Sequence, residues 1–67
     1  MSVLKVIEIL AHSEKSWEDA AQKAVDEAAK SVKNIKSVWI QDQSAEVRDN
    51  KITSYRVNTK ITFLVEH

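Results

Sequence analysis

The chain has 67 residues, enough for one small domain over residues 1–67, and its ten basic and ten acidic residues balance to zero net charge. Balanced charge without a basic stripe argues against a nucleic-acid partner, and no apolar run reaches the roughly 20 residues of a membrane span. The chain has no cysteine for disulfides, so self-association is the expected support for so small a core. The first residues lack the order of a signal peptide, so a cytoplasmic location is expected.

The first predicted element is a strand over Val3–Ala11, a β-branched stretch that is followed by polar residues. Side chains alternate between the two faces of a strand, and here both faces are largely apolar. One face carries Val3, Ile7, Ile9 and Ala11 with Lys5 among them, and the other carries Leu4, Val6 and Leu10 with Glu8. We therefore expect burial on both sides, by a helix on one and by another subunit on the other.

The segment Ser16–Val32 has the clearest helical period, with apolar residues every three or four positions on one stripe. The stripe is mostly alanine: Trp17, Ala20, Ala21, Ala24, Val25, Ala28, Ala29 and Val32. Ser16 is the expected N-cap, with Asp19 three residues later in a short version of the capping box. Asn34 is the expected stop, because asparagine tolerates the left-handed conformation. Trp17, in the first turn, is predicted to be a core residue or a hydrophobic-staple residue.

Two further strands are predicted over Ile35–Val47 and Ile52–Val65, joined at Asp49-Asn50 by a tight two-residue turn. The second of them alternates well and is expected in the centre of the sheet. The predicted fold class is α+β with the order β-α-β-β, in which a three-stranded antiparallel sheet is partly wrapped around one helix.

This turn sets a register between the two strands. It directs Val38 and Ile40, opposite Ile61 and Thr59, toward the helix. On the other face it places four cross-strand pairs: Ser37 with Thr62, Trp39 with Lys60, Gln41 with Asn58, and Gln43 with Arg56. We therefore predict a polar sheet face with one large aromatic side chain. A slip of one residue in this register would place these side chains on the opposite face.

The sequence contains no catalytic constellation, Gly-rich phosphate loop or metalloprotease motif, so an enzyme is not expected. His12 is predicted to be a surface residue in the loop between the first strand and the helix, and His67 is the C-terminal residue. Asp42, Glu46 and Asp49 offer oxygen ligands for a hard cation. The alternative is that they form a solvated acidic hairpin.

Trp39 is suited either to stacking on a flat ring or to burial against another subunit. Arg56 offers planar donors to a carbonyl, phosphate or carboxylate, or a salt bridge to a neighbouring subunit. The residue types leave both pairs of alternatives open.

Over its whole length the chain resembles the dodecin family of small β-α-β-β flavoproteins. The resemblance rests on the order and spacing of Lys5-Val6-Ile7-Glu8-Ile9, Ser13-Glu14-Lys15-Ser16-Trp17-Glu18-Asp19-Ala20-Ala21, Lys30-Ser31-Val32-Lys33-Asn34-Ile35, Tyr55-Arg56-Val57 and Ile61-Thr62-Phe63. It implies a hollow homododecamer with helices outward and sheets lining the interior. It also implies non-enzymatic storage or shielding of a flavin (riboflavin, FMN or FAD) at two-fold contacts.

In flavin-binding dodecins a strand tryptophan stacks on the ring and a last-strand glutamine bonds its edge. The resemblance places these two positions at Ser37 and Arg56 of this chain. Trp39 lies on the same face as Ser37, displaced by roughly 6–7 Å along the strand. The expected cofactor-binding residues are therefore Ser37, Trp39, Gln41 and Arg56. The alternative is a dodecin-like shell that binds a divalent cation or another cofactor, or that is purely structural.

Overall fold

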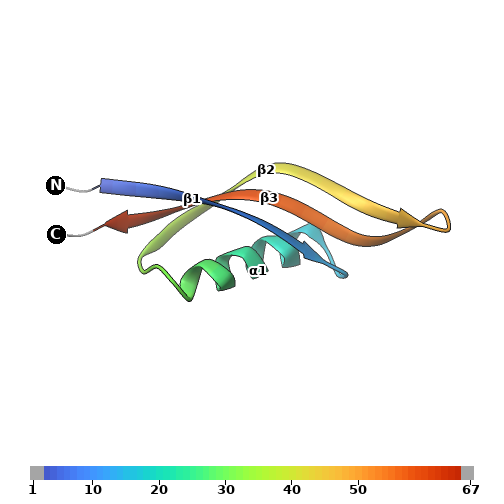
Figure 1. The fold of residues 1–67 in the computed structure, drawn as a ribbon, viewed down its shortest axis with the longest axis horizontal. Coiled ribbons are helices and arrows are strands. Elements are labelled where there is room, and N and C mark those ends of the chain that lie inside the picture. Colours follow the sequence, from blue (N-terminus) through green and yellow to red (C-terminus); the bar gives the residue numbers. More distant parts are fainter. Residues whose placement is uncertain (1–2, 66–67) are drawn as a thin grey trace.

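The computed structural model describes residues 3–65, and its element order confirms the predicted β-α-β-β fold. The elements are β1 (Val3–Ser13), α1 (Trp17–Ala29), β2 (Ile35–Arg48) and β3 (Lys51–Val65). The sheet is antiparallel, with strand order β1-β3-β2, so the last strand is central as predicted. Figure 1 shows that α1 lies against one face of the curved sheet, and that the β2–β3 hairpin extends well beyond the helix. Within residues 3–65, no helix or strand covers the opposite face of the sheet.

The core lies between α1 and the central strand. On β3 the residues facing the helix are buried in alternation, at Val57, Thr59 and Ile61. They meet three alanines one turn apart on α1, Ala20, Ala24 and Ala28, which are also buried. Alanine adds little apolar area, but its small side chain lets the helix backbone approach the sheet closely. The core is therefore thin, and Ile61 is its largest fully buried side chain.

Local signals set the start of the helix as predicted. Ser16 has an extended backbone, and its hydroxyl accepts a hydrogen bond of 3.0 Å from the Asp19 amide. The helix ends at Ala29, so the predicted extension to Val32 is wrong, although the Val32 amide still donates to the Ala28 carbonyl. Asn34 has a φ of 63°, which confirms the left-handed residue expected after the helix.

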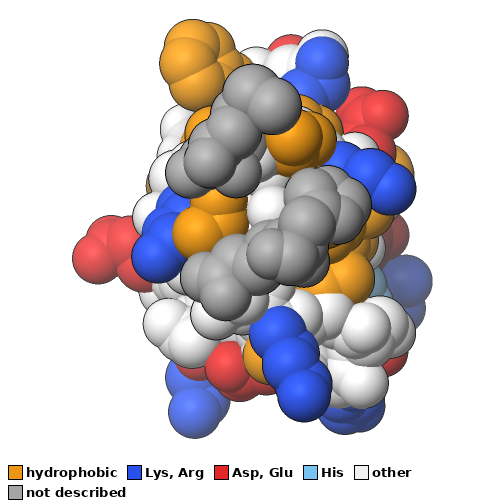
Figure 2. Space-filling model, turned by 90° about the vertical axis from the view of Figure 1, so that its left-hand side faces the viewer, with side chains coloured by type: hydrophobic (Ala, Val, Ile, Leu, Met, Phe, Trp, Pro, Cys, Tyr) orange, Lys and Arg blue, Asp and Glu red, His pale blue; other side chains and the backbone are white. Residues whose placement is uncertain are grey.

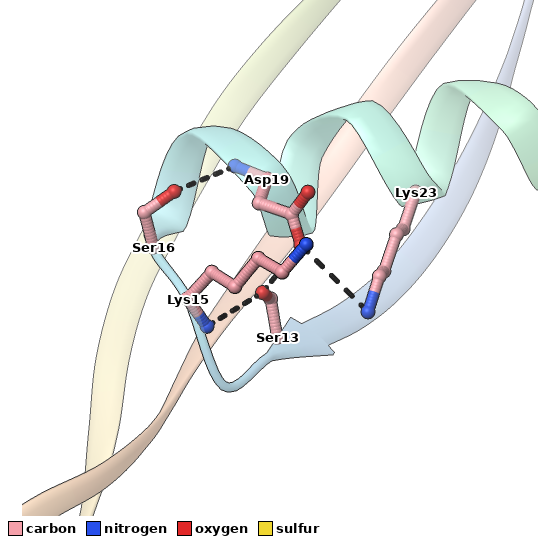
Figure 3. A network of polar contacts seen from close by, with 5 residues as sticks. All are labelled: Ser13, Lys15, Ser16, Asp19 and Lys23. Atoms are coloured by element: carbon pink, nitrogen blue, oxygen red, sulfur yellow. Dashed lines mark hydrogen bonds and ion pairs between the residues drawn. The ribbon is translucent and has the colours of Figure 1, made fainter.

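A polar network ties the end of β1 to the first turn of α1 (Figure 3). The Ser13 hydroxyl donates to the Asp19 carboxylate and accepts from the Lys15 amide at 2.9 Å. Lys23 forms an ion pair with the same carboxylate at 3.7 Å. The hydrogen bond from Ser13 and the charges of Lys23 and Lys15 hold the pKa of Asp19 below its ordinary value of 3.8. Because β1 runs on to Ser13, His12 belongs to this strand and not to a loop.

The hairpin turn has the predicted chemistry. Asp49 and Asn50 have φ angles of 53° and 64°, the two positive values that a type I′ turn requires. Near the turn Arg48 pairs with Lys51, and further along Trp39 pairs with Lys60 as predicted. The predicted pairs of Ser37, Val38 and Ile40 with Thr62, Ile61 and Thr59 are confirmed as well.

The predicted register is correct near the turn and around Trp39, but between these two regions it is wrong by one residue. The register changes between Ile40 and Asp42, where Gln41 is the extra residue, and again between Glu46 and Val47, where Thr53 is extra on β3. The two β-bulges compensate one another, so the error is confined to the segment between them. The predicted pairs of Gln41 with Asn58 and of Gln43 with Arg56 are therefore wrong.

Candidate functional site

The candidate site is the sheet face that α1 leaves uncovered, called here the open face. Strand alternation and the observed register assign its residues. They are Leu4, Val6, Glu8, Leu10 and His12 on β1, Ser37, Trp39, Asp42 and Ser44 on β2, and Arg56, Asn58, Lys60, Thr62 and Leu64 on β3. The bulge at Gln41 thus brings Asp42 and Ser44, not Gln41 and Gln43, opposite Asn58 and Arg56.

Trp39 is the large aromatic side chain of the open face, as predicted. It is 69% exposed and pairs with Lys60, which pairs in turn with Glu8 on β1. Ser37 lies two residues before Trp39 on the same face. Its hydroxyl shares a short hydrogen bond with the Thr62 hydroxyl on the neighbouring strand. An exposed indole on a sheet face offers a stacking surface that the serine beside it cannot provide.

A cavity of about 330 Å³ opens on the same face, next to the Trp39–Lys60 pair. The open-face residues that line it are Leu10 and His12 from β1, Asp42 and Ser44 from β2, and Arg56 and Asn58 from β3. Of the four predicted binding residues, Arg56 lies in this cavity and Trp39 beside it. Gln41, another of the four, is the exposed extra residue of the bulge. Gln43, which was predicted opposite Arg56, lies instead in a groove with Trp17 between α1 and β2.

Asn58 was not singled out by the sequence, yet it is the most unusual residue of this cavity. Its side-chain oxygen is buried and has no hydrogen-bond partner in the described chain. Burying a polar atom without a partner is unfavourable, so such atoms are rare in folded proteins and call for an explanation. No local pattern signals this property, because it arises from the strands on both sides of Asn58.

The β1 side of the open face is apolar and accessible. Leu4, Val6 and Leu10 are 58%, 55% and 76% exposed, so the predicted burial of this side of β1 stays a prediction that requires another subunit. Figure 2 views the molecule from the end where β1 begins and shows hydrophobic side chains at the surface between charged ones. Within one chain, this surface is not covered.

The acidic residues of the hairpin do not converge on a point within one chain. Among residues 3–65 no group of three His, Cys, Asp or Glu side chains has the arrangement of a metal site. Glu46, one of the candidate ligands, accepts a hydrogen bond of 3.0 Å from the Ser54 hydroxyl. Over the same described range, no helix is long and apolar enough to cross a membrane.

The fold defines the class of this protein: a small α+β protein with one helix against a three-stranded open sheet. The chain belongs to the dodecin family, whose model it matches over residues 3–66. It is 38% identical over 63 residues to the calcium dodecin of Mycobacterium tuberculosis, an alignment that covers 94% of this chain and 89% of the relative.

Solved dodecin structures have the same fold. The crystal structure of the calcium-chelating immunodominant antigen calcium dodecin from M. tuberculosis, with a calcium-binding site, has a TM-score of 0.80 at 37% identity, covering 96% of this chain and 91% of that one. A variant of the Thermus thermophilus dodecin has a TM-score of 0.92 at 22% identity, covering both chains fully. The Streptomyces davaonensis dodecin has a TM-score of 0.90 at 17% identity, covering 98% of this chain and 97% of that one. The last two support the fold alone.

Proposed function

We propose that this protein is a non-enzymatic binding and storage protein that holds a flavin-type ligand on the open face of a homododecamer. The observation that carries the proposal is Trp39, a tryptophan 69% exposed on a sheet face that no element of the chain covers. A flat ring stacked on the indole would bury apolar area that the chain itself leaves in water. Arg56, in the adjoining cavity, would donate to a carbonyl or phosphate of the same ligand.

The other two predicted binding residues have supporting positions in this proposal. Ser37 is held by its hydrogen bond to Thr62, so it would form part of the surface beside the ring. Gln41 lies at the bulge two residues after Trp39, where its exposed amide would reach the rim of a bound ligand.

Assembly is proposed because the apolar face of β1 needs a cover. Leu4, Val6 and Leu10 are more than half exposed, and a chain of 67 residues buries too little area to leave them in water without a loss of stability. Membership of the dodecin family supports twelve copies as the number. Light scattering after size exclusion should give about 91 kDa, twelve times the chain mass of 7.6 kDa. A stable monomer would contradict the proposal.

Flavin binding is tested by the visible spectrum of the purified protein and by titration of riboflavin fluorescence. We expect the wild type to quench the fluorescence at micromolar concentration. Trp39→Ala should weaken binding about 5- to 150-fold, because stacking of a ring on an aromatic side chain contributes about 1–3 kcal/mol. The affinity of Trp39→Phe for riboflavin should lie between those of the wild type and Trp39→Ala. Trp17→Phe, on the helix side, is the control for loss of an indole; it removes the 3.0 Å hydrogen bond from Trp17 to the Ser44 carbonyl but no stacking surface, so it should retain most of the binding. No quenching by an intact assembly would refute flavin as the ligand.

A divalent cation is the second candidate, and the observation that favours it is the similarity to a calcium dodecin at 38% identity. Asp42 and Asn58 lie opposite each other on β2 and β3, so their side chains would supply two oxygen ligands. Calcium takes six to eight, and further copies of the chain would have to complete the shell. Calorimetric titration with calcium, compared between the wild type and Asp42→Asn, tests this. Equal heats of binding would rule out Asp42 as a ligand.

A further inference from the structure

We propose that Asn58 is the residue that selects the ligand, by accepting a hydrogen bond from the imide N–H of a planar ring. The ligand class is a heteroaromatic ring whose edge carries one N–H between two carbonyl groups. This inference rests on the proposed function and deepens it, because flavins have such an edge. It assigns the recognition of that edge to a position two residues beyond Arg56 on the same face of β3.

The first observation is that Asn58 differs from every other buried polar side chain of the described chain. Ser13, Ser54 and Thr59 are buried, and the hydroxyl of each donates a hydrogen bond: to Asp19, to Glu46 and to the Ile9 carbonyl. The Asn58 oxygen alone is buried with no partner. Among residues 3–65 the buried side-chain polar atoms therefore all have partners except at Asn58, one of the residues that line the open-face cavity.

The second observation is the order of hydrogen-bonding groups along β3. Arg56, Asn58 and Lys60 follow one another on the open face, at a spacing of about 6–7 Å. They present a donor, an acceptor and a donor, which is the complement of carbonyl, N–H and carbonyl along an imide edge. Within residues 3–65 neither Arg56 nor Lys60 forms an ion pair, and both side chains are long enough to lean toward the centre.

The neighbours of Asn58 favour the same ligand. Asp42 lies opposite Asn58 on β2, so a ligand atom between them meets two acceptors and must itself be a donor. Leu10, on the β1 side, offers apolar surface to a ring, and Trp39, opposite Lys60, belongs to the next residue pair of the open face. Asn58 is only half-buried as a whole residue, and its terminal torsion is broad. Rotation about this torsion would turn the oxygen, which is buried in the structure, toward the cavity.

The test compares riboflavin with riboflavin methylated at the imide nitrogen, using the assembled wild type, Asn58→Leu and Thr59→Val. We expect the wild type to bind riboflavin at least tenfold more tightly than the methylated compound. Asn58→Leu should bind riboflavin more weakly and lose this preference. Thr59→Val changes the adjacent residue on the opposite face and should keep the preference.

Stability without ligand gives an independent readout. Asn58→Leu removes an unpartnered acceptor and keeps the branching and the number of heavy atoms of the side chain, so it should raise the Tm of the ligand-free protein by about 4 °C. Thr59→Val removes a satisfied hydrogen bond of 2.7 Å and should lower it. A lower Tm for Asn58→Leu would overturn the inference, because the oxygen must then have a protein partner.

The binding outcomes separate this inference from the proposed function. Wild-type protein that binds both compounds equally, or Asn58→Leu that keeps the preference, overturns the role of Asn58 while flavin binding stands. Wild-type protein that binds neither compound refutes both.

Discussion

Replacement of Ile61 by alanine should remove a large part of the stability of this protein. Ile61 is fully buried in the middle of β3 and packs in one cluster with Ala24 and Ala28 of the helix. Ile→Ala in a core costs about 2–5 kcal/mol, the sum of lost apolar burial and of the cavity that remains. We expect the upper half of that range, because the facing alanines have no atoms that can turn into the cavity.

The free energy lost in Ile61→Ala is large relative to the total free energy of unfolding. A chain of this length has a free energy of unfolding of roughly 3–10 kcal/mol. The assay is urea unfolding followed by tryptophan fluorescence, at one fixed protein concentration because self-association contributes to the measured stability. Ile61→Val, which deletes one carbon, is the matched control and should cost about 0.5–1.5 kcal/mol.

A double mutant tests the reason for the effect. Ala24→Val alone should cost about 1–3 kcal/mol by overpacking. Combined with Ile61→Ala, it should cost clearly less than the sum, because the added methyl groups fill the cavity. The reasoning is refuted if Ile61→Ala costs no more than Ile61→Val, or if the two changes add without coupling.

Two further predictions concern the ends of the elements. Asp19→Asn should lower Tm at neutral pH. Because the folded pKa of Asp19 is depressed, its stabilisation is present above 3.8 and is lost as the pH falls through the lower folded value, so the two melting curves should converge in acid; a constant difference would contradict this. Asn50→Val should destabilise the protein by more than 1 kcal/mol in urea unfolding, because a β-branched residue is strained at a φ of 64°, whereas Asn50→Gly should be neutral or stabilising.

The candidate site could be predicted only in part from the sequence. The sequence predicts the correct face for Trp39 and its correct partner, Lys60. The prediction follows from the two-residue turn at Asp49-Asn50, from which the cross-strand pairs are counted outward. The same count predicts Gln41 opposite Asn58, and this pair is wrong because one bulge lies between the turn and Asn58 and Gln41 is itself the extra residue of the other. A bulge adds one residue without a change in composition, so the alternation of polar and apolar residues does not reveal it.

The local features of this protein were determined by the sequence alone. The Ser16 cap, the positive φ angles at Asn34, Asp49 and Asn50, and the alternation of β3 each depend on residues a few positions apart. Their physical causes act within a turn or along one strand, so a pattern of residues is sufficient to predict them.

Only the tertiary structure decided which side chains meet on the open face. The compensating bulges bring Asp42, not Gln41, opposite Asn58, and the neighbouring strands leave the Asn58 oxygen buried without a partner. Both results depend on three strands that are distant in sequence, and on atoms whose burial is a property of their surroundings. For that reason the helix and the hairpin turn could be read from residue patterns, while the polar centre of the proposed binding face could not.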